Sequence, residues 1–136
     1  MTVENALINE KTIFEMDVVD LLKQVRNQTD PEHYMGESFD CISSAGPNAA
    51  DNHYSPTPET NRQIRKNETF LLDNGGQYLD GTTDVTRTIF VGNPPEEIKN
   101  RYTRVLQGNL NLATATFPIG TYGYQSGFNS NYILLY

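Results

Sequence analysis

The sequence predicts an α+β fold, in which two helices enclose a group of strands and a β-hairpin. Apolar residues between positions 14 and 26 recur every three or four residues, as they do on one face of a helix. The segment 82–89 is rich in β-branched residues and follows Asp80-Gly81, a dipeptide typical of tight hairpin turns. A second stretch with helical spacing begins after Asn93-Pro94-Pro95. The expected order is therefore helix, strands, hairpin, helix.

The first helix is expected from Thr12 to about Arg26. Thr12 and Glu15 have the spacing of a capping box, in which two side chains satisfy the free N–H groups at a helix start. The apolar stripe that would pack on the core consists of Phe14, Val18, Leu21, Leu22 and Val25.

A strand is expected from Ser38 to Ser44, closed by a turn at Gly46-Pro47-Asn48. The prolines of Ser55-Pro56-Thr57-Pro58 cannot donate to a strand ladder, so this segment is expected to be a loop. The second helix should end before Phe117-Pro118. Its apolar positions are Ile98, Tyr102, Val105, Leu106 and Ala113.

The hairpin carries two aspartates, Asp73 and Asp84, whose side chains are expected on one face. A two-residue loop at Asp80-Gly81 places Asp84 opposite Gln77, and Gln77 shares a strand face with Asp73 because their separation is even. A regular strand would leave the two carboxylates about four residues out of register, roughly 13 Å. A bend at Gly75-Gly76 is therefore expected to bring them together.

Two carboxylates held close together repel each other and lose hydration unless a cation or a set of donors compensates them. The pair Asp73 and Asp84 therefore indicates a divalent metal site, although adjacent Asp and Gly residues are also common in simple turns. A single calcium-binding turn is a weaker interpretation, because the spacing fits neither an EF-hand nor a repeated glycine-rich calcium motif.

The segment 72–88 resembles the first metal motif of the Xaa-Pro aminopeptidases, the aminopeptidase P branch of the creatinase and methionine-aminopeptidase superfamily with the pita-bread fold. The resemblance covers residues 2 to about 121, and its other motifs are similar in order and spacing to eukaryotic cytosolic members. These are Tyr34-Met35-Gly36, Ser38-Phe39-Asp40, Ile42-Ser43-Ser44, Gly46-Pro47-Asn48-Ala49-Ala50, His53-Tyr54-Ser55-Pro56, Val105-Leu106-Gln107-Gly108 and Phe117-Pro118-Ile119-Gly120-Thr121.

The resemblance implies a dinuclear metal centre, commonly of two manganese ions, for which Asp73 and Asp84 are the aspartate ligands. In that family a later His and two Glu complete the centre, which activates a water to release the N-terminal residue from peptides with proline in second position. The resemblance assigns His53 to substrate binding or transition-state stabilisation. Without it, a lone His between Asn and Tyr is most often a surface residue.

The metal site is incomplete in this polypeptide. After Asp84 the chain contains no His and no Asp, and its only Glu residues are Glu96 and Glu97, at the expected helix start where acidic residues are favoured. Residues 1–121 are therefore interpreted as the N-terminal half of a metallo-aminopeptidase catalytic domain without a catalytic residue of its own. Residues 122–136 are expected to be a divergent tail. The alternative is an inactive interaction module that dimerises with a second copy or a full-length relative.

Four residues depart from the family pattern. Asp51-Asn52 stands where relatives place two apolar residues, so the strand Ala49 to Tyr54 is expected to be exposed, displaced or frayed, which bears on His53. Asn109 stands where relatives have His, and Asn74 where they usually have Ser.

Composition excludes several partners. A formal net charge of -7 and a pI near 4.7 argue against nucleic acid and anionic membrane surfaces, which require basic patches. The chain shows no signal-type or spanning apolar segment, and its one cysteine, Cys41, allows no intrachain disulfide. The expected location is cytoplasmic, and Cys41 is expected to be a small strand residue.

Overall fold

The computed structural model describes residues 12–123, which fall into two units that divide after Asn93. The first unit contains the helix α2 (Glu15–Thr29), the short helix η1 (Gly46–Ala50) and the strands β1 (Tyr34–Glu37), β2 (Ile42–Ala45), β3 (Thr69–Asn74), β4 (Gly76–Tyr78), β5 (Gly81–Thr82) and β6 (Val85–Phe90). The second unit contains the helix α3 (Glu96–Thr114). Apart from Tyr122 and Gly123, the predicted tail lies outside the described residues.

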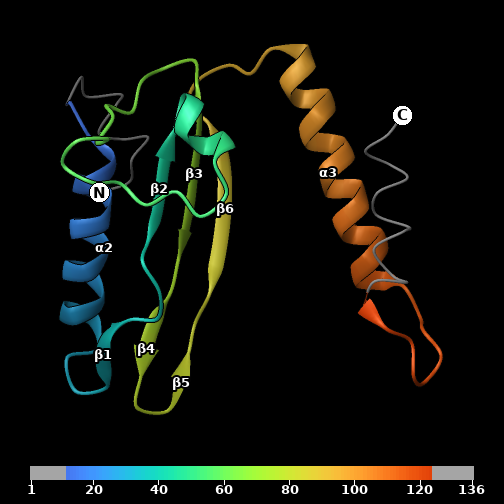
Figure 1. Ribbon diagram of the computed structural model, residues 1–136, viewed down its shortest axis with the longest axis horizontal. Helices are drawn as coiled ribbons and strands as arrows, with labels where there is room; N and C mark the ends of the chain where they lie inside the picture. Colours follow the sequence, from blue (N-terminus) through green and yellow to red (C-terminus); the bar gives the residue numbers. More distant parts are fainter. Residues whose placement is uncertain (1–11, 124–136) are drawn as a thin grey trace. The chain divides into compact units, whose positions relative to one another are not determined.

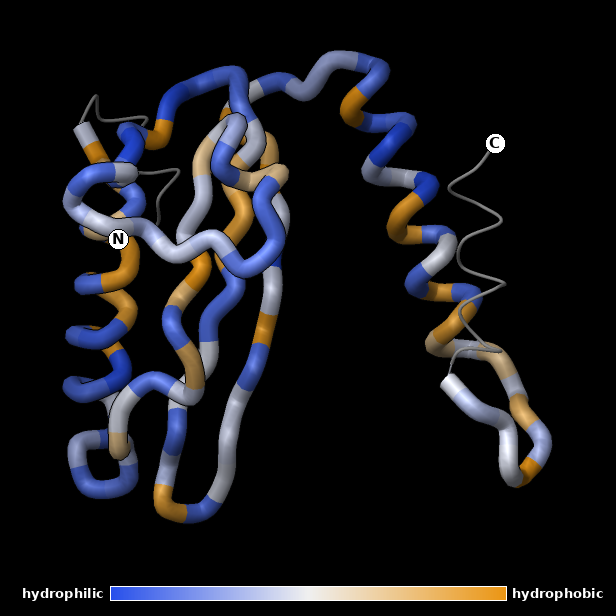
Figure 2. The backbone as a smooth tube through the Cα atoms, viewed as in Figure 1, coloured by the Kyte–Doolittle hydropathy of each residue, from blue (hydrophilic) through white to orange (hydrophobic). Residues whose placement is uncertain are grey.

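The strands form two antiparallel sheets of three strands each. One has the order β2-β3-β6, the other has the order β1-β4-β5, and α2 runs alongside the first (Figure 1). The side of α2 that faces the sheet is hydrophobic and its other side is hydrophilic (Figure 2). The buried core consists of Ile13, Val18, Ala45, Ile64, Phe70 and Val91, with Leu22, Leu72 and Ile89 packed against it.

The helix α2 begins at Glu15, three residues later than the predicted start, and Thr12 does not cap it. Ile13 accepts a backbone hydrogen bond from Ile64 at 2.9 Å, and Phe14 forms a β-bridge with Gln63, so residues 13–14 are extended rather than helical. The carboxylate of Asp17 accepts the Phe14 N–H at 2.8 Å, which caps the helix from inside. Phe14 and Val25 are exposed, so the predicted stripe is wrong at its two ends.

The hairpin turn consists of Leu79 and Asp80 rather than Asp80 and Gly81, because Tyr78 pairs with Gly81 and Gln77 with Thr82. The predicted register is therefore wrong by two residues. Pairing with β1 holds the observed register. The rings of Tyr34 and Tyr78 form a tilted contact with centroids 5.5 Å apart. The Leu79 N–H donates to the His33 carbonyl at 3.0 Å.

The second helix and the interruption at the paired glycines follow the sequence prediction. The helix α3 contains all five predicted apolar positions. The strand β3 ends at Asn74 and β4 begins at Gly76, so the chain passes from one sheet to the other at Gly75. No helix within residues 12–123 has the length and hydropathy needed to cross a membrane.

Candidate metal centre

Asp73 lies in the middle strand of the first sheet, on the face opposite to the core. Phe70 and Leu72 pack in the core on the α2 side, and side chains alternate along a strand, so Asp73 faces the other way. Its backbone partners are Ile42 on one side and Thr86 on the other. Pairing on both sides fixes the position of this carboxylate.

Asp84 lies two residues before Thr86 and therefore has the same strand parity as Asp73. Asn74 pairs with Val85, and the Thr83 N–H donates to the Gly76 carbonyl at 2.9 Å, so Asp84 is the residue across from Gly75. Diagonal neighbours of this kind in an antiparallel pair lie about 7–8 Å apart. The backbone offset between Asp73 and Asp84 is two residues instead of the predicted four.

The carboxylate of Asp73 has an unpaired oxygen that suits a cation. Its Oδ1 is buried and has no hydrogen-bond partner among the described residues. A buried carboxylate oxygen without a hydrogen-bond donor is unfavourable, and carboxylate oxygens are ligands that hard divalent cations bind readily. Residues 12–123 contain no group of three or more His, Cys, Asp or Glu side chains that could hold a metal ion. The two aspartates thus make up part of a site.

Glu96 and Glu97 pair with basic residues of their own helix. They lie in the first turn of α3, where Glu96 pairs with Lys99 at 2.7 Å and Glu97 with Arg101 at 2.6 Å. Both contacts join residues three or four apart on the helix surface, as expected for acidic residues at a helix start.

Gly75 allows the close approach of three segments next to the two carboxylates. A Cβ atom at this position would lie 2.1 Å from Ser38 Oγ and 2.1 Å from the Thr83 carbonyl oxygen. The same atoms bind each other, since Ser38 Oγ donates to the Thr83 carbonyl at 2.9 Å. Only glycine fits here, and the sequence signal that indicated it was the Gly75-Gly76 pair.

His53 is exposed and lies in a turn, not in a strand. The helix η1 ends at Ala50, and His53 has a φ of 66°, in the left-handed region. Asp51 and Asn52 are exposed and belong to no strand, in line with the expectation that this segment is exposed, displaced or frayed. Ser55 Oγ donates to the Cys41 carbonyl at 3.4 Å, which places this turn near the end of β2 that pairs with Asp73. The role of His53 in substrate binding stays a prediction.

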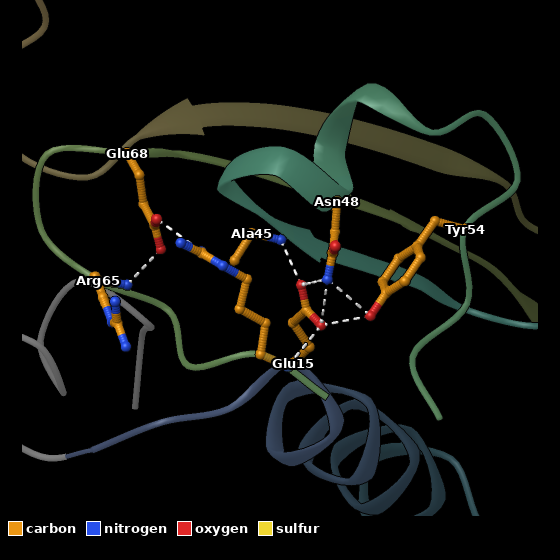
Figure 3. A network of polar contacts seen from close by, with 7 residues as sticks. Glu15, Ala45, Asn48, Tyr54, Arg65 and Glu68 are labelled. Carbon is orange, nitrogen blue, oxygen red and sulfur yellow. Dashed lines mark hydrogen bonds and ion pairs between the residues drawn. The ribbon is translucent and has the colours of Figure 1, made fainter. Parts of the chain in front are cut away.

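The turn is held by a buried carboxylate, Glu15, whose importance the sequence did not reveal (Figure 3). Glu15 is fully buried and accepts hydrogen bonds from the Ala45 N–H at 2.6 Å, the Tyr54 hydroxyl at 2.7 Å, the Arg62 N–H at 3.0 Å and Asn48 Nδ2 at 3.1 Å. Burial is the main cause that raises the pKa of Tyr54, and the Glu15 carboxylate raises it further. Tyr54 therefore remains a donor at neutral pH.

Cys41 lies one residue before β2 and is only 4% exposed. Burial raises the pKa of its thiol to about 11, and nearby Glu37 adds to the shift. At pH 8 roughly one thiol in a thousand is ionised, so the folded chain should react with iodoacetamide far more slowly than the chain in guanidinium chloride. Mass spectrometry of the alkylated chain measures this. Equal rates in both conditions would show that Cys41 is accessible.

Comparison with known proteins shows the family to which this chain belongs. A model of metallopeptidase family M24 matches residues 3–128, so the chain belongs to this family. The match extends seven residues into the segment 122–136 that was predicted to diverge.

Among the curated relatives, a probable Xaa-Pro aminopeptidase P from Talaromyces marneffei is 51% identical over 122 residues, which are 89% of this chain and 18% of the relative. A probable Xaa-Pro aminopeptidase P from Coccidioides posadasii is 49% identical over the same share of this chain. The chain thus spans about a fifth of the length of these relatives.

Solved structures show the same fold. X-prolyl aminopeptidase from Caenorhabditis elegans, described as a cytosolic enzyme with a di-nuclear active site, is 40% identical with a TM-score of 0.88. The match covers 98% of this chain and 22% of that one. X-Pro aminopeptidase from Thermotoga maritima is 19% identical with a TM-score of 0.79, covering 91% of this chain and 33% of that one, which shows the fold alone. The α+β arrangement is therefore part of the pita-bread fold of these aminopeptidases.

Proposed function

We propose that Asp73 and Asp84 are two ligands of a dinuclear divalent metal centre in an Xaa-Pro aminopeptidase. The observation that carries this proposal is the buried, unpartnered Oδ1 of Asp73 on the strand face that Asp84 shares. Membership of metallopeptidase family M24 and the likeness to a C. elegans enzyme with a di-nuclear active site support it.

In the reaction, the two aspartates would hold the metal ions with their negative charge and fixed strand positions. Asp73 is the more firmly placed ligand, because the strands on both sides pair with it. When bound, divalent ions such as manganese lower the pKa of water and polarise a carbonyl group. The substrates of this proposal are peptides with proline in second position, in the cytosol.

The segment after Asp84 has no His and no Asp, so it does not supply the remaining groups of the site. His53 would contact the substrate from the turn held by Glu15, Tyr54 and Ser55. A homodimer is a second part of the proposal. The relatives named above are peptidases, and they lend no support to an inactive interaction module.

Titration of the 136-residue chain with Mn²⁺ tests the assignment. Asp73→Asn and Asp84→Asn should each weaken Mn²⁺ binding at least tenfold, because each removes one anionic ligand from a pair that already lacks ligands. Isothermal calorimetry and the Mn²⁺ paramagnetic resonance signal measure free and bound ion. The matched control is Asp80→Asn, which changes the same charge in the turn of the same hairpin. Equal losses of Mn²⁺ affinity in all three variants would show only general charge attraction and contradict the proposed metal site.

A further inference from the structure

The amide of Asn74 connects the two strands that carry the aspartates. Asn74 directly follows Asp73 and is 7% exposed, with its side chain on the α2 face of the sheet. Its Nδ2 donates to the carbonyl of Val85 at 3.4 Å, and Val85 directly follows Asp84. A single side chain therefore bridges the strands at the residues next to both carboxylates.

The same amide is held from the other side by the helix. Arg26, in the last turn of α2, donates from Nη2 to Asn74 Oδ1. The amide thus uses both ends at once, one for the helix and one for the strand of Asp84. The two bonds orient the amide between the helix and the strand that leads to Asp84.

Beyond Asn74 the strands lose their regular pairing for one step. Gly75, Thr83 and Asp84 belong to no strand. Asp84 lies between Val85, which pairs with Asn74, and Thr83, whose N–H donates to the Gly76 carbonyl. The hydrogen bond from Asn74 to the Val85 carbonyl therefore joins β3 and β6 at their last paired residues before this interruption. Loss of this tie should act on Asp84 more than on Asp73, which has strands on both sides.

Arg26 carries a feature that packing alone does not explain. Its Nη1 is buried and has no hydrogen-bond partner among the described residues. A buried unpaired donor on a cation lowers stability, so this arrangement is a poor way to attach a helix to a sheet. Its one described side-chain bond reaches the residue next to Asp73.

We propose that Arg26, acting through the buried amide of Asn74, is a positioning residue that sets the spacing of the carboxylates Asp73 and Asp84. This inference rests on the proposed function, because the spacing matters only if both carboxylates bind the same metal centre. Groups that orient metal ligands commonly change metal affinity ten- to hundredfold when they are removed.

The test compares two variants with one control in the full chain. Asn74→Leu keeps the side-chain shape and removes both bonds, and Arg26→Met keeps length and removes the cation. Asn74→Leu should weaken Mn²⁺ binding at least tenfold and Arg26→Met severalfold, with circular dichroism confirming that both remain folded. The control, Arg104→Met, breaks a similar Arg–Asn bond at 2.8 Å on the surface of α3 and should leave Mn²⁺ affinity unchanged.

The outcomes separate the alternatives. If Asn74→Leu lowers the unfolding temperature but the folded chain binds Mn²⁺ like the parent, Asn74 is only a structural brace and the proposal is overturned. If the parent chain does not bind Mn²⁺, the proposed function fails. Nuclear Overhauser contacts between Gly75 and Asp84 then test the positioning role. Their loss in Asn74→Leu, with contacts between β3 and β6 retained, supports the positioning role. Their retention overturns it.

Discussion

Glu15→Ala should destabilise the chain by about 4 kcal/mol, a large part of the total stability of a small domain. The substitution removes a fully buried carboxylate that accepts four hydrogen bonds, two from backbone N–H groups and two from side chains. The backbone N–H groups of Ala45 and Arg62 would then lose their acceptor, while the Tyr54 hydroxyl keeps Thr60 and Asn48 keeps the Tyr54 hydroxyl. Urea unfolding followed by circular dichroism measures the loss.

Two further variants define the origin of that effect. Glu15→Gln keeps the shape and one acceptor oxygen but brings an NH₂ group toward donors, so it should fall between the parent and Glu15→Ala. Glu96→Ala removes a carboxylate of the exposed Glu96–Lys99 pair and should change stability by less than about 1 kcal/mol. A loss below about 1 kcal/mol for Glu15→Ala would show that the network contributes little. Hydrogen exchange over residues 45–62 locates the change.

Gly75→Ala should disrupt the hairpin and lower stability by about 3 kcal/mol. The added methyl group would lie 2.1 Å from the backbone oxygen of Thr83, which cannot move without breaking the pairing of residues 76 and 83. Asp84 is the neighbour of that oxygen, so the variant should also lose Mn²⁺ affinity. Unfolding and Mn²⁺ titration measure the two effects.

Gly81→Ala is the matched control for this variant. It lies in the same hairpin, and a Cβ there meets no atom within 4 Å. Its stability and Mn²⁺ affinity should equal those of the parent within error. The double variant Gly75→Ala with Ser38→Ala removes one of the three clashes and should remain destabilised, because the Thr83 oxygen is still in place. Full recovery in the double variant would contradict the backbone explanation.

The features that the sequence predicted correctly have local causes. The helix α3 and the core side of α2 follow from the spacing of apolar residues. The interruption at Gly75 follows from a pair of glycines inside a strand. Each depends on neighbours within a few positions in the chain.

The features that it missed depend on contacts between distant residues. The register differs by two residues from the one that Asp80-Gly81 favours, and Tyr78 pairs with Tyr34, 44 positions earlier in the chain. The sequence indicated only a capping role for Glu15. Its buried role was missed because the four groups that donate to it lie 30 to 47 positions away. No local pattern contains that information.

The same separations have a consequence for the order of folding. The bonds to Glu15 close loops of 30, 33, 39 and 47 residues, and closing loops of this length loses chain entropy before any bond compensates it. The helix α2 and the β3–β6 ribbon need only local contacts and can form early. We therefore expect the segment 46–62, including the turn of His53, to acquire its shape after the helix has docked on the sheet. During refolding, this surface should be among the last parts of the first unit to become native.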